Sequence, residues 1–158
     1  MSKWFLFNFI LLIILIWNVM GHFSFPNLQI HIWFGLMGAL LFIYNWTRNA
    51  VFETIRNVPN RKTKVKLARL SKRVVTLHRW TGNIALVAIL AHGSLVMYRY
   101  GFSISNYKMV VGVIALVTLA IQIATGWLRL YKPTIKLRYI HLYMGMTLFF
   151  LILLHIVL

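Results

Sequence analysis

The chain has 158 residues, of which 61% are hydrophobic, and its 17 Lys and Arg residues are accompanied by a single acidic residue, Glu53. A soluble domain carries roughly 25% charged residues of both signs, whereas this chain carries 11%, so its composition indicates an integral membrane protein. The absence of Cys excludes disulfides, thiolate metal sites, iron–sulfur clusters and thioether attachment of haem, and a lone carboxylate excludes paired-carboxylate catalysis within the chain.

Long apolar stretches predict five transmembrane helices, each near the ~20 residues that cross the hydrocarbon core of a bilayer. In chain order they cover about residues 4–20, 28–47, 74–98, 107–130 and 137–158. The first stretch resembles a signal peptide, but no small-residue cleavage site follows it, so we expect an uncleaved anchor. The expected fold is an all-α bundle of five transmembrane helices that forms one domain over residues 1–158.

The longest polar segment, residues 48–73, lies between the second and third spans and contains the basic run NRKTKVKLARLSKR. Two interpretations are open for this basic loop. It is either a short amphipathic helix on the membrane surface or an irregular loop whose charges set the topology. Docking of a partner onto the loop is a further alternative.

The positive charges also predict the orientation. With the N-terminus in the cytoplasm, all Lys and Arg residues except Arg99 and Lys108 lie at the inner face, as the positive-inside rule requires. The C-terminus is then outside, and the third and fifth spans run in the same direction. Because the basic residues lie between apolar spans and not on a soluble face, we expect no binding of nucleic acid.

The third and fifth spans share one histidine pattern, H-x3-G-x9-H. HRWTGNIALVAILAH runs from His78 to His92, and HLYMGMTLFFLILLH runs from His141 to His155. Fourteen residues of helix rise about 21 Å and complete nearly four turns, so both histidines of a span return to nearly the same face. Parallel spans therefore place His78 opposite His141 near the inner surface and His92 opposite His155 near the outer surface.

Two imidazoles that face each other suit a flat, six-coordinate metal group such as haem, with one nitrogen on each side of the iron. A tetrahedral zinc site needs more ligands at each level than this chain offers. Gly82 and Gly145 each follow an inner histidine by four residues, on the same helical face, and would let a macrocycle approach the backbone. Close packing of helices is the alternative role for these glycines, and hydrogen bonding between helices is the alternative role for the four histidines.

Haem propionates need cationic or hydrogen-bonding partners. The candidates at the inner level are Arg73, Arg79 and Arg138, and those at the outer level are Tyr98, Arg99 and Lys108. His22 and His31 do not share the spacing of the other histidines. We expect both at a surface or an interface, with proton delivery or metal binding at the outer surface as the alternative.

On these four histidines and this topology, the chain resembles the transmembrane di-haem b-type cytochromes, in particular the ferric reductase-like membrane domain. In that family, paired histidines about fourteen residues apart occur in the third and fifth spans, and the cytochrome b561 group has a similar spacing. The resemblance implies two haem b groups as cofactors, each with two histidine ligands. The chain departs from the family in two ways, because no sixth span follows the fifth and no G-x-G-x-x-G motif of a flavin or nicotinamide domain is present.

The expected function is electron transfer across a cell membrane. The short chain and its uncleaved first span are typical of a bacterial membrane protein. The expected donor is a quinol, with a bound quinone as an additional cofactor candidate, or a separate cytosolic flavoprotein. The expected acceptor outside is ferric iron, oxygen or superoxide, or a protein. The alternatives are a non-catalytic haem-binding anchor subunit, a haem-handling protein, and a haem-free helical scaffold.

Overall fold

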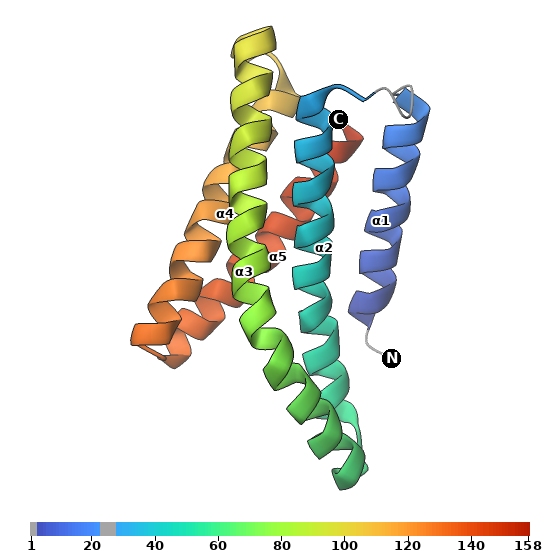
Figure 1. The fold of residues 1–158 in the computed structure, drawn as a ribbon, viewed down its shortest axis with the longest axis vertical. Coiled ribbons are helices and arrows are strands. Elements are labelled where there is room, and N and C mark those ends of the chain that lie inside the picture. Colours follow the sequence, from blue (N-terminus) through green and yellow to red (C-terminus); the bar gives the residue numbers. More distant parts are fainter. Residues whose placement is uncertain (1–2, 23–27) are drawn as a thin grey trace.

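Five helices make up the described part of the chain, which in this computed structural model comprises residues 3–22 and 28–158, without the side chains of residues 22, 70 and 73–76. The helices are α1 (Lys3–His22), α2 (Ile30–Asn57), α3 (Arg61–Tyr100), α4 (Tyr107–Tyr131) and α5 (Ile135–Val157). They run alternately up and down, so α3 and α5 are parallel, as the sequence predicted (Figure 1).

Each of the five helices contains a stretch that is long and apolar enough to cross a membrane, by its length and composition. Large apolar side chains such as those of Trp17, Val87 and Phe150 are exposed on the helices. An exposed apolar surface of this extent is unfavourable in water and marks a membrane or protein contact. The predicted all-helical fold is therefore confirmed, with five helices that are long and apolar enough to span a membrane, as in a multi-pass membrane protein.

The basic segment at residues 48–73 is almost entirely helical, so it is not the irregular loop that was one of the two interpretations. Only residues 58–60 lie outside a helix there, because α2 continues well past its predicted end at residue 47 and α3 begins well before residue 74. The segment is helical, as one of the two interpretations proposed, but it is not a separate surface helix. It extends α2 and α3 without interruption.

The break between α2 and α3 has local causes. Pro59 cannot donate a helical hydrogen bond, and the side chain of Asn60 then caps α3 by accepting hydrogen bonds from the backbone N–H groups of Lys62 and Thr63, at 2.9 and 3.4 Å. Lys and Arg are good helix formers although they lower the hydropathy. Hydropathy alone therefore did not show that α2 and α3 continue as helices beyond the predicted spans.

The helices pack as two main pairs, α2 on α3 and α4 on α5, and α1 covers α2 and α5. A core of buried side chains lies between these elements and includes Leu11, Trp46, Leu148 and Phe149. Over their described lengths, α3 and α5 have almost no direct backbone approach. The two helices that carry the histidine pattern therefore face each other across a space.

Candidate functional site

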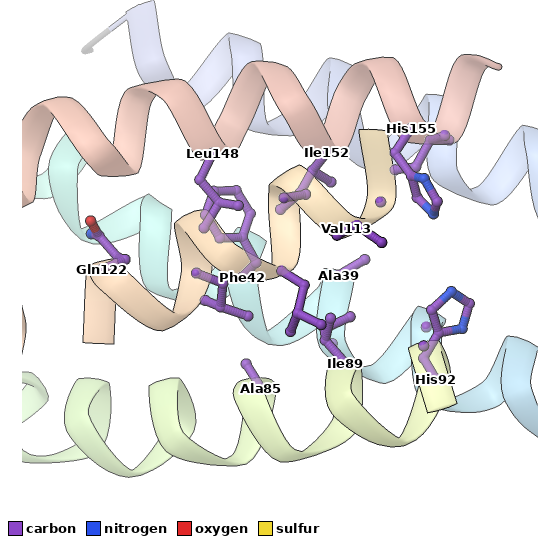
Figure 2. A pocket seen from close by; sticks show the side chains of 18 of the residues that line it. Ala39, Phe42, Ala85, Ile89, His92, Val113, Gln122, Leu148, Ile152 and His155 are labelled. Atoms are coloured by element: carbon purple, nitrogen blue, oxygen red, sulfur yellow. The ribbon is translucent and has the colours of Figure 1, made fainter. Parts of the chain in front are cut away.

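A cavity of about 770 Å³ fills the space between the helix pairs. This volume lies within the range of roughly 300–1,000 Å³ that is typical of cofactor and ligand sites. Its middle section is lined by apolar side chains, among them Phe42, Ile89 and Leu148 (Figure 2). All four histidines of the repeated pattern line the cavity, so the chain offers one elongated apolar chamber with imidazoles near both ends.

The four histidines form the two facing pairs that the sequence predicted. The ring centroids of His78 and His141 are 6.4 Å apart, with an angle of 80° between the ring planes. Those of His92 and His155 are 6.3 Å apart, with an angle of 87°. Each pair joins α3 to α5, and Figure 2 shows His92 and His155 pointing toward each other at one end of the cavity.

The separation within each pair fits one metal ion between the rings. A metal–imidazole bond is about 2 Å long and a ring nitrogen lies about 1 Å from its ring centroid, so imidazoles on opposite sides of one ion have centroids about 6 Å apart. Within residues 3–22 and 28–158, no three His, Cys, Asp or Glu side chains gather into a metal-binding group. A metal held at either pair would therefore need further ligands from a cofactor such as a macrocycle.

Hydrogen bonds set the tautomer of both histidines at the second pair. The Nδ1 atom of His92 lies 2.7 Å from the carbonyl oxygen of His31, and that of His155 lies 3.0 Å from the carbonyl oxygen of Lys108. Because a carbonyl oxygen can only accept, each Nδ1 carries the hydrogen and each Nε2 keeps its lone pair. This is the arrangement that metal-binding histidines usually have.

The first pair is less symmetric. The Nδ1 atom of His78 lies 2.9 Å from Asn45 Oδ1, which also accepts a hydrogen bond from the Thr81 hydroxyl at 2.7 Å. At His141, Nδ1 lies 3.1 Å from the Thr125 hydroxyl oxygen, and Nε2 lies 3.3 Å from the side-chain nitrogen of Gln122. A distance of 3.3 Å is long for a hydrogen bond, so the Gln122 amide binds His141 Nε2 only weakly.

Three glycines that the sequence analysis did not single out lie directly against the histidine rings. A Cβ atom at Gly35 would lie 2.9 Å from the His92 ring, one at Gly112 2.9 Å from the His155 ring, and one at Gly126 3.3 Å from the His141 ring. The first two distances are too short for real side chains. Gly112 and Gly126 are fourteen residues apart, the same spacing as the histidines, and this repeat was the signal that could have identified them.

The two glycines that the sequence did single out have different surroundings. Gly82 lines the cavity, and a Cβ there would meet only Asn45, at 4.0 Å, so this position has the free space that was expected. Gly145 is buried and not among the residues that line the cavity. A Cβ there would lie 2.7 Å from the Trp46 ring, so Gly145 has the alternative role, close helix packing.

The predicted cationic partners are only partly at the cavity. Arg79 and Lys108 line it. Arg138 and Arg99 are exposed and do not; Arg99 instead lies over the Tyr100 ring. Tyr98 is 92% exposed, and the side chain of Arg73 lies outside the described ones.

Two arginines not assigned to the site from sequence line the cavity together with Arg79. They are Arg48 of α2 and Arg129 of α4. Arg48 lies three residues beyond Asn45, the partner of His78, so these cations belong to the end that holds the first pair. Within the described structure, Arg48 Nε is buried without a hydrogen-bond partner.

His31 is not a member of either facing pair. His31 is only 8% exposed, and its ring centroid lies 6.1 Å from that of His92 and 5.8 Å from that of Tyr100. It thus lies in the cavity wall and not at a surface, and it supports His92 through its backbone carbonyl. The side chain of His22 lies outside the described ones.

No family model, curated protein or solved structure matches this chain.

Proposed function

We propose that the chain is a di-haem b-type membrane cytochrome that carries electrons across the membrane. Its resemblance to the ferric reductase-like membrane domain and the cytochrome b561 group belongs to this proposal. The observation that carries it is the presence of two facing histidine pairs, with centroid separations of 6.3 and 6.4 Å, in a single cavity. When bound, the haem groups would supply one-electron redox chemistry through their iron atoms.

The residues around the histidines prepare them as ligands. The carbonyl oxygens of His31 and Lys108 hold the Nδ1 hydrogens of His92 and His155, which orients the rings and raises the basicity of Nε2. His78 with His141, and His92 with His155, would each hold one haem iron. Two histidine ligands for each iron would favour electron transfer over oxygen binding at the metal.

The apolar residues between the pairs supply spacing and insulation. Fourteen residues of α3 and of α5 separate the two levels by about 21 Å of helix rise. Side chains such as Phe42, Leu148 and Ile152 line this interval and would exclude water. A dry, low-dielectric interior is one of the means by which proteins tune the potential of a haem.

The cationic side chains suit haem propionates. Arg48, Arg79 and Arg129 line the cavity at the end of the first pair, and Lys108 lines it at the end of the second. The buried Arg48 Nε has no acceptor in the described structure, and a propionate there would supply one. Charge-assisted hydrogen bonds of this kind are about twice as strong as neutral ones.

The distribution of charge favours an orientation with the N-terminus and the His78–His141 end in the cytoplasm and the C-terminus outside. In this orientation, electrons would enter at the His78–His141 pair from a quinol or a soluble flavoprotein. They would leave from the His92–His155 pair to ferric iron, oxygen or superoxide, or a protein. The membrane would be the cytoplasmic membrane of a bacterium.

The alternative function is that of a haem-binding anchor subunit or a haem-handling protein. The asymmetry of the two pairs favours it, because the Gln122 amide lies against His141 Nε2, whereas no described group bonds to either Nε2 atom of the second pair. A chain that holds haem firmly at one level and exchangeably at the other would pass haem on without turning over electrons.

Electron transfer through lipid vesicles separates these functions. The haem-loaded chain is reconstituted into vesicles that contain trapped ferricyanide, and dithionite is added outside. The proposed cytochrome should accelerate bleaching of the trapped ferricyanide over that in protein-free vesicles. Haem that becomes reduced while ferricyanide persists would contradict transmembrane transfer and support the anchor or haem-handling function.

Replacing Asn45 with leucine is expected to weaken haem binding at the first pair by roughly 10–100-fold, because His78 loses the acceptor of its Nδ1 hydrogen. The measurement is a haem titration followed in the visible spectrum, made in a His92→Ala background where only this pair remains. Thr118→Val is the matched control, since the Thr118 hydroxyl bonds to the Ile114 carbonyl of its own helix and to no other described group. Equal affinities for Asn45→Leu and the control would contradict the assigned role.

A further inference from the structure

Beyond the His78–His141 level, α2 and α3 continue farther than the helices beside them. Asn45 is level with His78 through their hydrogen bond. The 12 residues from Asn45 to Asn57 rise about 18 Å, and the 17 residues from Arg61 to His78 rise about 26 Å. Figure 1 shows this extension as a two-helix hairpin that ends farthest from the remaining helices. We refer to residues 53–72 as the basic hairpin.

The other helices end much closer to the histidines. At this end, a Cβ on Gly126 would touch the His141 ring, so these two residues are level. From there, α4 continues five residues to Tyr131, and α5 begins six residues before His141, which is a rise of only about 8–9 Å. The basic hairpin therefore projects roughly 10–17 Å past the connection between α4 and α5.

The basic hairpin is strongly and uniformly positive. Its only acidic residue is Glu53, which is also the only one in the chain. Its seven basic residues are all exposed, and they are Arg56, Arg61, Lys62, Lys64, Lys66, Arg69 and Lys72. With one carboxylate in the whole chain, the protein itself cannot neutralise them.

Three of these cations lie on one face of α3. Lys62, Lys66 and Arg69 follow the spacing i, i+4, i+7, which places them in one row along a helix. The half-buried Leu67 and the buried Ser71 lie on the opposite side by the same periodicity. The row of cations is thus turned away from the buried face of the hairpin.

The geometry distinguishes a soluble partner from the lipid surface. The apolar span of α3 begins at Leu77, and the 16 residues from Arg61 to Leu77 continue the same helix for about 24 Å. The attraction of anionic lipids falls off within a Debye length, about 8 Å at physiological salt. A hairpin that continues the α3 span along the membrane normal would therefore hold most of its charges outside the field of the headgroups.

We propose that the basic hairpin is the docking surface for an acidic, soluble electron-donor protein. This inference rests on the proposed electron-transfer function. α3 leads directly from the hairpin to His78 and Arg79, and α2 leads from it to Arg48 and Asn45. A protein bound there therefore lies at the end of the molecule that holds the first pair. Complementary charge of this kind steers association and raises its rate at low salt.

The first test measures binding of oxidised flavodoxin, an acidic soluble flavoprotein, to the full chain in nanodiscs of uncharged phosphatidylcholine. The hairpin variant carries three substitutions, Lys62→Gln, Lys66→Gln and Arg69→Gln. It is compared with a matched variant that carries Lys132→Gln, Lys136→Gln and Arg138→Gln. These three control sites are also exposed, and they lie between α4 and α5 or in the first turn of α5. The hairpin variant should bind about tenfold more weakly at low salt, the matched variant should bind nearly as the wild type, and added salt should remove the difference. Equal losses in both variants, or no loss in either, would overturn the proposal.

The second test addresses the lipid alternative. Because the chain has no Cys, Val65→Cys gives a single site for a nitroxide spin label on the exposed side of the hairpin. In nanodiscs containing anionic phosphatidylglycerol, the label should be relaxed by a water-soluble nickel chelate and not by oxygen dissolved in the bilayer. The reverse result would place the hairpin on the membrane surface and overturn the docking role.

Haem is counted in the same samples. If the chain takes up no haem but still binds flavodoxin through the hairpin, the proposed electron-transfer function is wrong and the docking surface stands. If the chain contains both haem groups but binds flavodoxin independently of the hairpin, the proposed docking surface is wrong and the proposed cytochrome function stands.

Discussion

Replacing His92 with alanine is expected to remove one of two bound haem groups and to abolish electron transfer across the membrane. His92 is the α3 member of the second pair, 6.3 Å from His155, and no other described side chain occupies its place. The His78–His141 pair lies about 21 Å away along the helices and should keep its haem. The measurement is the haem content per chain of the purified variant, together with the rate of ferricyanide bleaching in vesicles.

His31→Ala is the matched control for this variant. His31 is a buried histidine at the same end, with its ring centroid 6.1 Å from that of His92, but it supports His92 through its backbone carbonyl, which alanine retains. The His31 variant should therefore keep both haem groups. Undiminished haem in His92→Ala, or the same loss in both variants, would show that His92 is not a ligand.

Replacing Gly112 with alanine is expected to weaken binding of the haem at the His92–His155 pair, although neither histidine ligand is changed. The new Cβ would lie 2.9 Å from Cε1 of His155, so the imidazole must move away from its position opposite His92. Haem affinity at this pair should fall by roughly 10–100-fold, the range seen when a ligand loses its support. The stability of the folded chain should change little. Alanine favours a helix over glycine by about 1 kcal/mol, and this gain offsets the loss of the hydrogen bond from the displaced imidazole to the Lys108 carbonyl oxygen.

A loss of haem affinity without a matching loss of stability makes the variant informative. Gly21→Ala is the control, since a Cβ there meets nothing within 4 Å and the site is on α1. It should leave haem binding unchanged. Thermal unfolding and haem titration are measured on both variants. A Gly112→Ala chain that binds haem as tightly as the Gly21→Ala chain would show that the contact with the His155 ring does not position a ligand.

The spans and the histidine pairs could be predicted because both follow from periodicity along a single helix. Apolar runs gave the number of helices, the charges gave their relative directions, and a spacing of fourteen residues brought His78 and His92 to one face. Once α3 and α5 are parallel, two facing pairs follow. No knowledge of side-chain packing was needed for this part of the site.

The features that sequence reasoning missed depend on contacts between helices. Whether Gly145 lines the cavity or packs on Trp46 is set by the rotation of α5 in the bundle, which hydropathy does not determine. Arg138 and Arg99 were placed by their nearness in sequence to a histidine, but their side chains project outward. Gly35 became recognisable only when the His92 ring of a neighbouring helix was found against it.

The lengths of α2 and α3 were missed for a different reason. Lys and Arg between residues 48 and 73 lower the hydropathy, so the segment was interpreted as a boundary of the membrane. A helix does not have to end where the membrane ends, and basic residues favour helix formation. Pro59 was the one residue in this segment that marked the true break.

The measurement that tests the central claim most directly is the absorption spectrum of the detergent-purified chain, air-oxidised and dithionite-reduced, with haem counted per polypeptide after expression with added haem. Two facing histidine pairs predict two low-spin haem b groups per chain, with a sharp α-band on reduction. A chain that contains no haem under these conditions would contradict the account and leave the four histidines as hydrogen-bonding groups within a helical bundle.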